Sequence, residues 1–547
     1  MILGIDVGGT YSDGVLISNN KIINQVKVKT NSEDLISSIK EIKGSLNISD
    51  KSLEKVIVST TLMTNFIVEK KYEKIGLFLI PGPGMVYSDN LFPFPYKLLK
   101  GGIDFQGRLI SDIDKDEVIK KTEEFLNAGI DKISINGKFS PRNPVLENKV
   151  YEIIKKNFPE IKIEKGIDLS GNLNFIRRSV SSGLKIASEK VFDTFLKALI
   201  TVFPDTKNIN ILKSDGGLVP LELSRNFSVE TIFSGPAASA FGALALLKDI
   251  QSALVIDIGG TTSDYSLILN KEPLFASKGI KINNFYTTAR GLSVFSLPLG
   301  GDTKINFHSE GFNFSINKTL PAMEGGNDIT ISDCLCFLNE INIGNRELAS
   351  KALQKEAKTL GISEKDLADK ILNQAGKIIA DSLSQVIEHW EKEPKYKVWQ
   401  IENQMKIYPE VLLLIGGPAK GLKKYIQNYI DIPVVVDSRA MTANALGAAL
   451  AKESFSSYIR INTSEGTVSS GWGYFEEKTF SKRLHPDEGK EYALKITNRH
   501  LNNLGIKDIP QIYEHEIFSI VRDGYTSGQI HEIHLGLKPG IREGVKL

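Results

Sequence analysis

Two segments, Ile5–Ile17 (IDVGGTYSDGVLI) and Ile256–Ile268 (IDIGGTTSDYSLI), share residue types that could bind phosphate groups. Each has an Asp at the end of an apolar run, followed by two glycines, a Thr and a Ser-Asp pair, and nine of the thirteen aligned residues are identical. Consecutive glycines let backbone N–H groups approach a phosphate without an intervening Cβ, and the Thr hydroxyl adds a donor. The sequence therefore predicts two phosphate-binding turns, each within a β-hairpin, in a duplicated domain.

The residues of these two turns divide into three predicted roles. The predicted phosphate contacts are Gly8, Gly9, Thr10 and Asp13 in the first copy and Gly259, Gly260, Thr262 and Asp264 in the second. The carboxylates at the strand ends, Asp6 and Asp257, could hold a hydrated Mg²⁺ or orient an attacking nucleophile. Because Thr261 and Thr262 follow Asp257, we place the chemical step at Asp257 and Thr261, and metal positioning mainly at Asp6.

A third small-residue turn follows the apolar run Val411–Ile415. Its residues, Gly416, Gly417 and Pro418, could let a flat adenine lie against the backbone. The order hairpin, hairpin, GGPA resembles that of the superfamily of sugar kinases, actins and large heat-shock chaperones. The resemblance implies an α/β fold of two ribonuclease H-like domains (the actin-like ATPase fold) that flank an interdomain cleft for ATP.

Other segments narrow the resemblance to one branch of that superfamily, and they are Ser59–Asn65 (STTLMTN), the turn Phe139–Pro144, Ser214–Gly217 and Ser234–Ala238 (SGPAA). Together with the two hairpins they resemble the hydantoinase A/oxoprolinase family, which comprises ATP-dependent cyclic amide hydrolases and relatives that include ketone carboxylases. The resemblance extends from residue 1 to about residue 451. It implies phosphoryl transfer from ATP, with Mg²⁺, to the oxygen of a cyclic amide or related carbonyl, and a possible hydantoinase B-like second subunit.

One stretch departs from the family pattern. Where the family carries His-Thr-Val and then a glycine-rich run, this chain has Phe295–Thr303 (FSLPLGGDT), with Phe295 in place of the His. Asp302 in this stretch could coordinate Mg²⁺ or be a solvated loop carboxylate. Two alternatives to a cyclic amide hydrolase therefore stay open: a protein-remodelling or reactivating ATPase of the same fold, and a small-molecule kinase.

The sequence predicts two domains and an appendix. A first ribonuclease H-like domain is expected over 1–175, a second over 176–454, and an appendix of unassigned fold over 455–547. A crossover helix is expected at Leu173–Leu199. In the appendix His515, His531 and His534 could suggest a metal site, but the last two face opposite sides of a predicted strand, which favours a structural role.

Composition excludes several classes of function. The chain has 67 Lys and Arg against 65 Asp and Glu, a net charge of +2, so nucleic acid is not an expected partner. The apolar runs are far shorter than the roughly 20 residues of a membrane span, and the first residues do not resemble a signal peptide. The two cysteines, Cys334 and Cys336, are expected to be free thiols. We therefore expect a cytoplasmic protein that does not bind membranes.

Overall fold

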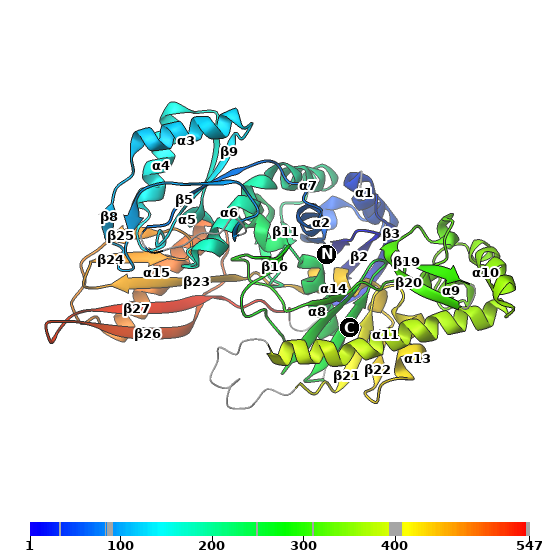
Figure 1. Cartoon of the computed structure of the whole chain (residues 1–547). Coiled ribbons are helices and arrows are strands. Elements are labelled where there is room, and N and C mark those ends of the chain that lie inside the picture. The colour runs from blue at the N-terminus through cyan, green and yellow to red at the C-terminus, as the bar shows by residue number, and fades with distance from the viewer. Residues whose placement is uncertain are drawn as a thin grey trace.

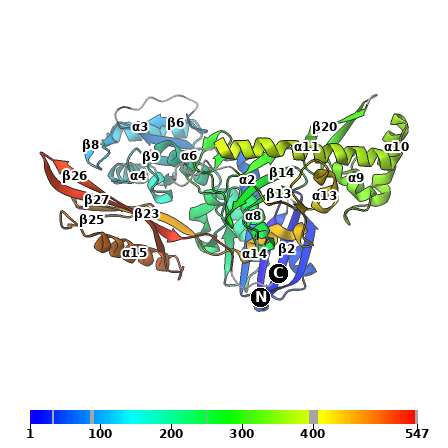
Figure 2. The same cartoon turned by 90° about the horizontal axis from the view of Figure 1, so that it is seen from below.

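The computed structural model describes residues 1–31, 34–82, 84, 91–247, 250–308, 311–392 and 407–542. Two sheet-based domains meet at the centre of the molecule, and an elongated arm, made of a segment from the first third of the chain and of its C-terminal part, extends away from them (Figures 1 and 2). The arrangement confirms the expected α/β fold of two ribonuclease H-like domains.

The first domain is built on a six-stranded sheet of order β12-β11-β4-β1-β2-β3. Its strands are β1 (Ile2–Val7), β2 (Tyr11–Ser18), β3 (Lys21–Lys29), β4 (Lys55–Thr60), β11 (Ile209–Leu212) and β12 (Leu218–Pro220). Strands β1 and β2 form the expected hairpin, and β4 lies parallel to β1. The sheet carries helices α1 (Leu35–Ser45), α2 (Leu62–Val68) and α7 (Glu189–Val202). Because β11 and β12 follow residue 175, this sheet crosses the proposed boundary, and the division at 175 and 454 stays a prediction.

The second domain repeats this plan with the order β15-β14-β13-β21-β22, and β18 also pairs with β14. Its strands are β13 (Ala253–Ile258), β14 (Ser263–Leu269), β15 (Glu272–Pro273), β18 (Phe295–Leu297), β21 (Val411–Ile415) and β22 (Val434–Val435). Its helices are α9 (Ile331–Phe337), α10 (Arg346–Leu360), α11 (Glu364–Lys392) and α13 (Ala419–Gln427). The hairpin β13–β14 and the parallel strand β21 lie where the sequence predicts them.

The two sheets are joined at the back by two helices made of small residues, α8 (Ser234–Leu246) and α14 (Ala443–Leu450). Glycines let their backbones touch, since a Cβ built on Gly447 would lie 2.0 Å from the carbonyl oxygen of Ala238. Helix α14 also packs on β1, where a Cβ on Gly4 would lie 2.2 Å from the carbonyl oxygen of Ala445. This contact brings the carboxyl ends of β1 and β13 to the same region.

A separate parallel sheet, β10-β9-β5-β6, is inserted after β4. It comprises β5 (Gly76–Ile80), β6 (Tyr96–Leu98), β9 (Lys132–Gly137) and β10 (Lys162–Lys165), with α3 (Lys115–Asn127), α4 (Val145–Asn157), α5 (Gly166–Leu169) and the hairpin β7 (Gly102–Ile103)–β8 (Leu109–Ser111). The single helix expected at Leu173–Leu199 is wrong. Two helices, α6 (Phe175–Ala187) and α7, meet at Ser188, whose backbone leaves the helical region with φ of −104° and ψ of 2° and whose hydroxyl donates to the carbonyl of Leu184.

The C-terminal part forms an antiparallel sheet of order β25-β24-β23-β27-β26, with α15 (Pro486–Asn503) packed on β26 and β27. Its strands are β23 (Phe455–Asn462), β24 (Thr467–Ser470), β25 (Phe475–Glu477), β26 (Gln511–Arg522) and β27 (Tyr525–Leu537). The three histidines do not meet at one point. The ring nitrogens of His515 and His531 lie 3.1 Å apart, whereas the His534 ring packs at a tilt against Tyr458. Within the described ranges no group of three or more His, Cys, Asp or Glu side chains could hold a metal ion.

The remaining elements are short and lie in connections. They are β16 (Lys281–Ile282), β17 (Phe285–Tyr286), β19 (Thr303–His308), β20 (Gly311–Lys318), η1 (Asp50–Ser52), η3 (Leu221–Thr231), η4 (Ala322–Glu324) and η5 (Ala440–Thr442). In the part of the chain that the structure describes, no single helix has both the length and the apolar character to cross a membrane; only the pair η3 and α8, bent by 98°, meets these criteria jointly.

We expect Gly447→Ala to lower the free energy of unfolding by about 1–3 kcal/mol, because the added methyl group must push two helix backbones apart. Gly44 in α1 is a matched control, since a Cβ there meets nothing within 4 Å. Gly44→Ala should be neutral or stabilising by up to about 1 kcal/mol. Urea unfolding of both variants tests this, and an equal effect of the two substitutions would contradict the role given to the α8–α14 contact.

Candidate active site

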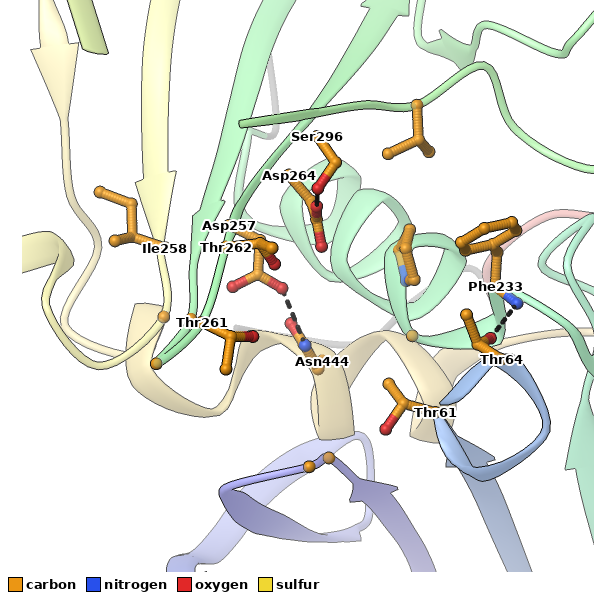
Figure 3. Close-up of a pocket in the computed structure, with 18 of the residues that line it drawn as sticks. Thr61, Thr64, Phe233, Asp257, Ile258, Thr261, Thr262, Asp264, Ser296 and Asn444 are labelled. Carbon is orange, nitrogen blue, oxygen red and sulfur yellow. Dashed lines mark hydrogen bonds between the residues drawn. The ribbon is translucent and has the colours of Figure 1, made fainter. Parts of the chain in front are cut away.

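The two glycine turns face each other across a cavity of about 1130 Å³ between the domains. A Cβ built on Gly260, in the second turn, would lie only 3.0 Å from the Thr10 hydroxyl oxygen of the first. In the view of Figure 3, Asp257, Thr261 and Thr262 lie above the first hairpin. The duplication therefore places the two predicted phosphate-binding turns beside one another at a single cavity, where they could hold a polyphosphate together.

Strand register brings two carboxylates to the cleft from each hairpin. Asp6 is directly opposite Asp13, and Asp257 is directly opposite Asp264. Residues opposite each other in an antiparallel pair project from the same face of the sheet. In each hairpin the Asp at the strand end and the Asp after the turn therefore lie side by side. The equal spacing of these residues in the two copies gives both hairpins the same arrangement.

One side chain links the two domains at the carboxylates. The Asn444 amide nitrogen lies 3.0 Å from Asp257 Oδ2 and 3.3 Å from Asp6 Oδ2, and it donates to both. The Ser59 hydroxyl donates to Asp6 at 2.6 Å, and the Ser239 hydroxyl lies 2.5 Å from Asp257. Sequence reasoning missed Asn444 and Ser239; the only signal was their place on the two small-residue helices.

Burial raises the pKa of several cleft carboxyls. The pKa of Asp6 is raised mainly by burial and further by the charge of Asp257, against hydrogen bonds from Ser59 and Asn444. Burial likewise raises the pKa of Asp13 and of Asp264 to about 6, although Lys27 opposes the shift at Asp13 and Ser296 opposes it at Asp264. Concentrated negative charge of this kind favours a bound cation.

The GGP turn closes one end of the cavity. Gly416 has φ of +95°, and a Cβ there would lie 2.3 Å from the carbonyl oxygen of Ile258, so this glycine lets the turn pack against the end of β13. Pro418 lies beside Gly301, and the cavity is also lined by the apolar side chains of Met323, Ile341 and Ile343. Apolar surface next to exposed backbone suits the flat ring of a nucleotide base.

Asp302 lies against the second glycine turn. Its backbone N–H donates to the carbonyl of Gly260 at 2.7 Å, and the residue is 8% exposed, so the alternative of a solvated loop carboxylate is wrong. Burial, then the charge of Glu324, raises the pKa of Asp302 to about 6. Glu324 itself bonds to Tyr11 and Lys29 of the first domain and so joins the domains at a second point.

Phe295, which departs from the family pattern, packs close to a histidine from another element. The Phe295 ring lies 6.0 Å from that of Tyr265 and 6.0 Å from the imidazole of His389. His389 lies near the C-terminal end of α11 and lines the cavity. An imidazole is therefore available to the cleft from a helix, although the strand that bears Phe295 supplies none.

The structure brings all the predicted site residues to this one cavity. They are Asp6, Gly8, Gly9, Thr10, Asp13, Asp257, Gly259, Gly260, Thr261, Thr262, Asp264, Gly416, Gly417 and Pro418. Their individual roles in binding or catalysis stay predictions. The donor set fits a magnesium nucleotide: hard carboxylate oxygens at Asp6 and Asp257, and glycine turns whose open faces admit phosphate.

Residues 2–158 match the hydantoinase/oxoprolinase N-terminal region, and residues 180–456 match the hydantoinase/oxoprolinase domain. The chain belongs to the hydantoinase/oxoprolinase family. This confirms the resemblance inferred from the hairpins and the SGPAA segment. The part after residue 456 lies outside both matches.

Curated relatives in this family are distant. The chain is 25% identical to an uncharacterised protein of Methanocaldococcus jannaschii over 70% of this chain and 64% of that protein. It is 22% identical to caprolactamase subunit alpha of Pseudomonas jessenii, over 48% of this chain and 43% of the relative. It is also 22% identical to the acetophenone carboxylase gamma subunit of Aromatoleum aromaticum, over 66% of this chain and 57% of that subunit. The matches thus span less than two thirds of these relatives' own lengths.

Two solved structures of family members share the fold over the whole chain. Nucleotide-free acetone carboxylase superposes with a TM-score of 0.72 at 17% identity, covering 100% of this chain and 88% of the other. The ATP-dependent caprolactamase of Pseudomonas jessenii gives a TM-score of 0.66 at 17% identity with the same coverage. The family fold therefore includes the arm and the C-terminal sheet.

We expect Asp302→Asn to stabilise the protein at pH 8 but not at pH 4. Between about pH 4 and 6 the folded state binds more protons at Asp302 than the unfolded chain does, so this carboxyl lowers the free energy of unfolding as pH rises. Above pH 6 the uncharged amide of the Asn variant should raise the free energy of unfolding by about 1–3 kcal/mol relative to the unaltered protein. Urea unfolding at both pH values, with a chelator present, measures the difference.

Asp112→Asn is the matched control, because Lys149 holds the pKa of the exposed Asp112 carboxyl below its usual value. This substitution should destabilise slightly at pH 8 and have no effect well below the pKa of Asp112. A gain from Asp302→Asn that is equal at pH 4 and pH 8 would contradict the electrostatic explanation.

Proposed function

We propose that this protein is an ATP-dependent hydrolase of the hydantoinase/5-oxoprolinase type, which activates a cyclic amide or related carbonyl by phosphoryl transfer. The observation that supports this most directly is the pair of opposed GGT turns around one cavity, with the carboxylates Asp6 and Asp257 between them. Membership of the hydantoinase/oxoprolinase family supports the same reaction class.

The proposed reaction consumes one ATP for each ring opened. The carbonyl oxygen of the amide attacks the γ-phosphorus, the bond from that phosphorus to the bridging oxygen breaks, and ADP leaves. Water then adds to the activated carbon and the carbon–nitrogen bond breaks, with a proton passing to the leaving nitrogen, so that an acyl phosphate forms. A second water hydrolyses this acyl phosphate to the carboxylate and inorganic phosphate. Activation is needed because an amide is stabilised by resonance, and phosphate is a far better leaving group than the amide oxygen.

The chain's own residues have proposed roles in this reaction. The amides of the glycine turns and the hydroxyls of Thr10 and Thr261 would donate to the transferring phosphoryl group. Asp257 would orient the reacting groups, and Asp6 would hold the metal. When bound, Mg²⁺ would neutralise charge on the phosphate oxygens.

A second subunit is part of the proposal. Two of the relatives are named as subunits, caprolactamase subunit alpha and acetophenone carboxylase gamma subunit. We propose that this chain likewise acts with a hydantoinase B-like protein. The cleft would supply the phosphorylated substrate.

Incubation of the purified chain with Mg-ATP tests the reaction class, using 5-oxoproline, hydantoin, 2-piperidone and caprolactam as candidate substrates. We expect slow phosphate release that depends on one of the cyclic amides, accompanied by the ring-opened product, and weak activity on 5-oxoproline because Phe295 replaces the family His. A stable phosphorylated product would instead indicate a kinase. Phosphate release that needs only a protein partner would indicate a remodelling ATPase.

We expect Asp257→Asn to lower turnover at least about 100-fold while changing ADP affinity less than about threefold, since the carboxylate acts on the reacting groups more than on nucleotide binding. Single-turnover phosphate release and calorimetric titration measure the two effects separately. Asp431→Asn, on the exposed surface after α13, is the control and should change neither. Loss of nucleotide binding with an unchanged rate per bound nucleotide would show that the role given to Asp257 is wrong.

A further inference from the structure

The STTLMTN segment forms one wall of the cleft. None of the proposed contacts to the nucleotide involves its residues. Helix α2 presents one face to the cavity, because the lining residues follow helical spacing: Thr61, Thr64, Asn65 and Val68. Side chains at these spacings lie on one side of a helix. This face therefore meets whatever occupies the space beside the phosphates.

The wall is fixed to helix α8. The Thr64 hydroxyl oxygen accepts a hydrogen bond of 2.9 Å from the backbone N–H of Phe233, which immediately precedes α8. A Cβ built on Gly235 would lie 3.2 Å from the methyl group of Thr61. Figure 3 shows Thr61, Thr64 and Phe233 on one side of the pocket, across from Asp257 and Asp264. The α2 face is thus held in place before any ligand binds.

Asn65 is a polar residue of this wall whose side-chain amide has no assigned role. A Cβ built on Gly9 would lie 3.6 Å from Asn65 Nδ2, so the amide stands beside the first glycine turn. Its side chain is exposed, and among the described residues it has no hydrogen-bond partner. A free donor and a free acceptor therefore project into the cavity next to the predicted phosphate site.

Apolar side chains line the same cavity as Asn65. Val68, Tyr286 and Leu292 line the cavity and offer apolar surface. On the far side the Asp264 carboxylate already accepts a hydrogen bond of 2.6 Å from Ser296. A compact ligand with an apolar body and one polar edge would fit between these walls.

The chemistry of Asn65 matches that of a cyclic amide. In a small lactam ring the amide bond is held cis, so its N–H and C=O point from the same edge. A primary amide also presents N–H and C=O from one edge, and the two edges can form a pair of hydrogen bonds. A ketone offers only the acceptor, and an N-methyl lactam has lost the donor.

We propose that Asn65 recognises the cis-amide edge of the substrate and so selects cyclic amides with a free ring N–H over ketones and N-alkylated lactams. This inference rests on the proposed function and specifies its substrate class. Asn65 Nδ2 donates to the substrate oxygen, Asn65 Oδ1 accepts from the ring N–H, and the second lone pair of the substrate oxygen stays free for the phosphoryl group.

The test compares 2-piperidone with N-methyl-2-piperidone and cyclohexanone on the full chain in the presence of Mg-ADP. Ligand binding is measured by saturation-transfer NMR titration, independently of turnover. We expect the unaltered protein to bind 2-piperidone at least about tenfold more tightly than the other two, because an unmatched polar group in the site is costly. Asn65→Ala should reduce this preference to less than about twofold and leave ADP binding unchanged.

Asn157→Ala is the matched control, since Asn157 is an exposed Asn at the end of the remote helix α4. It should keep the full preference. Should Asn65→Ala fail to fold, Asn65→Asp, of nearly equal size, replaces it and should likewise lose the preference, because it lacks the donor.

The outcomes separate this inference from the proposed function. If the unaltered protein prefers 2-piperidone and a folded Asn65 variant keeps that preference, Asn65 is not the recognition residue and the proposed hydrolase function stands. If the unaltered protein binds N-methyl-2-piperidone or cyclohexanone as tightly as 2-piperidone, the selection itself is absent. If it neither binds nor turns over any cyclic amide tested, the proposed function fails, and this inference fails with it.

Discussion

Asp6 and Asp257 come from different domains, yet both accept a hydrogen bond from the single amide of Asn444. Two carboxylates at such a junction repel each other, and burial adds to the cost of their charges. Ser59 and Ser239 each donate to one of them, and the cavity of about 1130 Å³ that the glycine turns line could take up a cation and phosphate. The cleft is therefore most stable when something positively charged lies between the two hairpins.

This constraint explains the composition of the helices behind the cleft. Asn444 can reach both carboxylates only because α14 lies directly against α8 and β1, and small residues are what permits that approach. Larger side chains at Gly4, Gly242 or Gly447 would separate the domains and move the carboxylates apart. At the other side of the cleft the link is polar, through Glu324 to Tyr11 and Lys29, so it can break and reform more readily than the packed contact.

A phenylalanine and a histidine from different elements meet at the cleft. Phe295 removes a titratable group from a strand, while His389 presents an imidazole to the same cavity from the end of α11. The hairpins depend on local sequence, whereas the walls of the cleft come from elements that are distant from one another in the sequence. Asn65, on the α2 wall, lies in the STTLMTN stretch that is part of the family resemblance.

The sequence by itself determined the two hairpins, the third small-residue turn and the family, because each depends on residues adjacent in the chain: an Asp, two glycines and a Thr fix a turn locally. The tertiary structure alone revealed Asn444, Ser239, Glu324 and His389 as parts of the site, since each reaches it from an element distant in sequence. It also decided the break at Ser188 and the entry of β11 and β12 into the first sheet. Those features depend on packing and on pairing between distant segments, which no local pattern of residue types encodes.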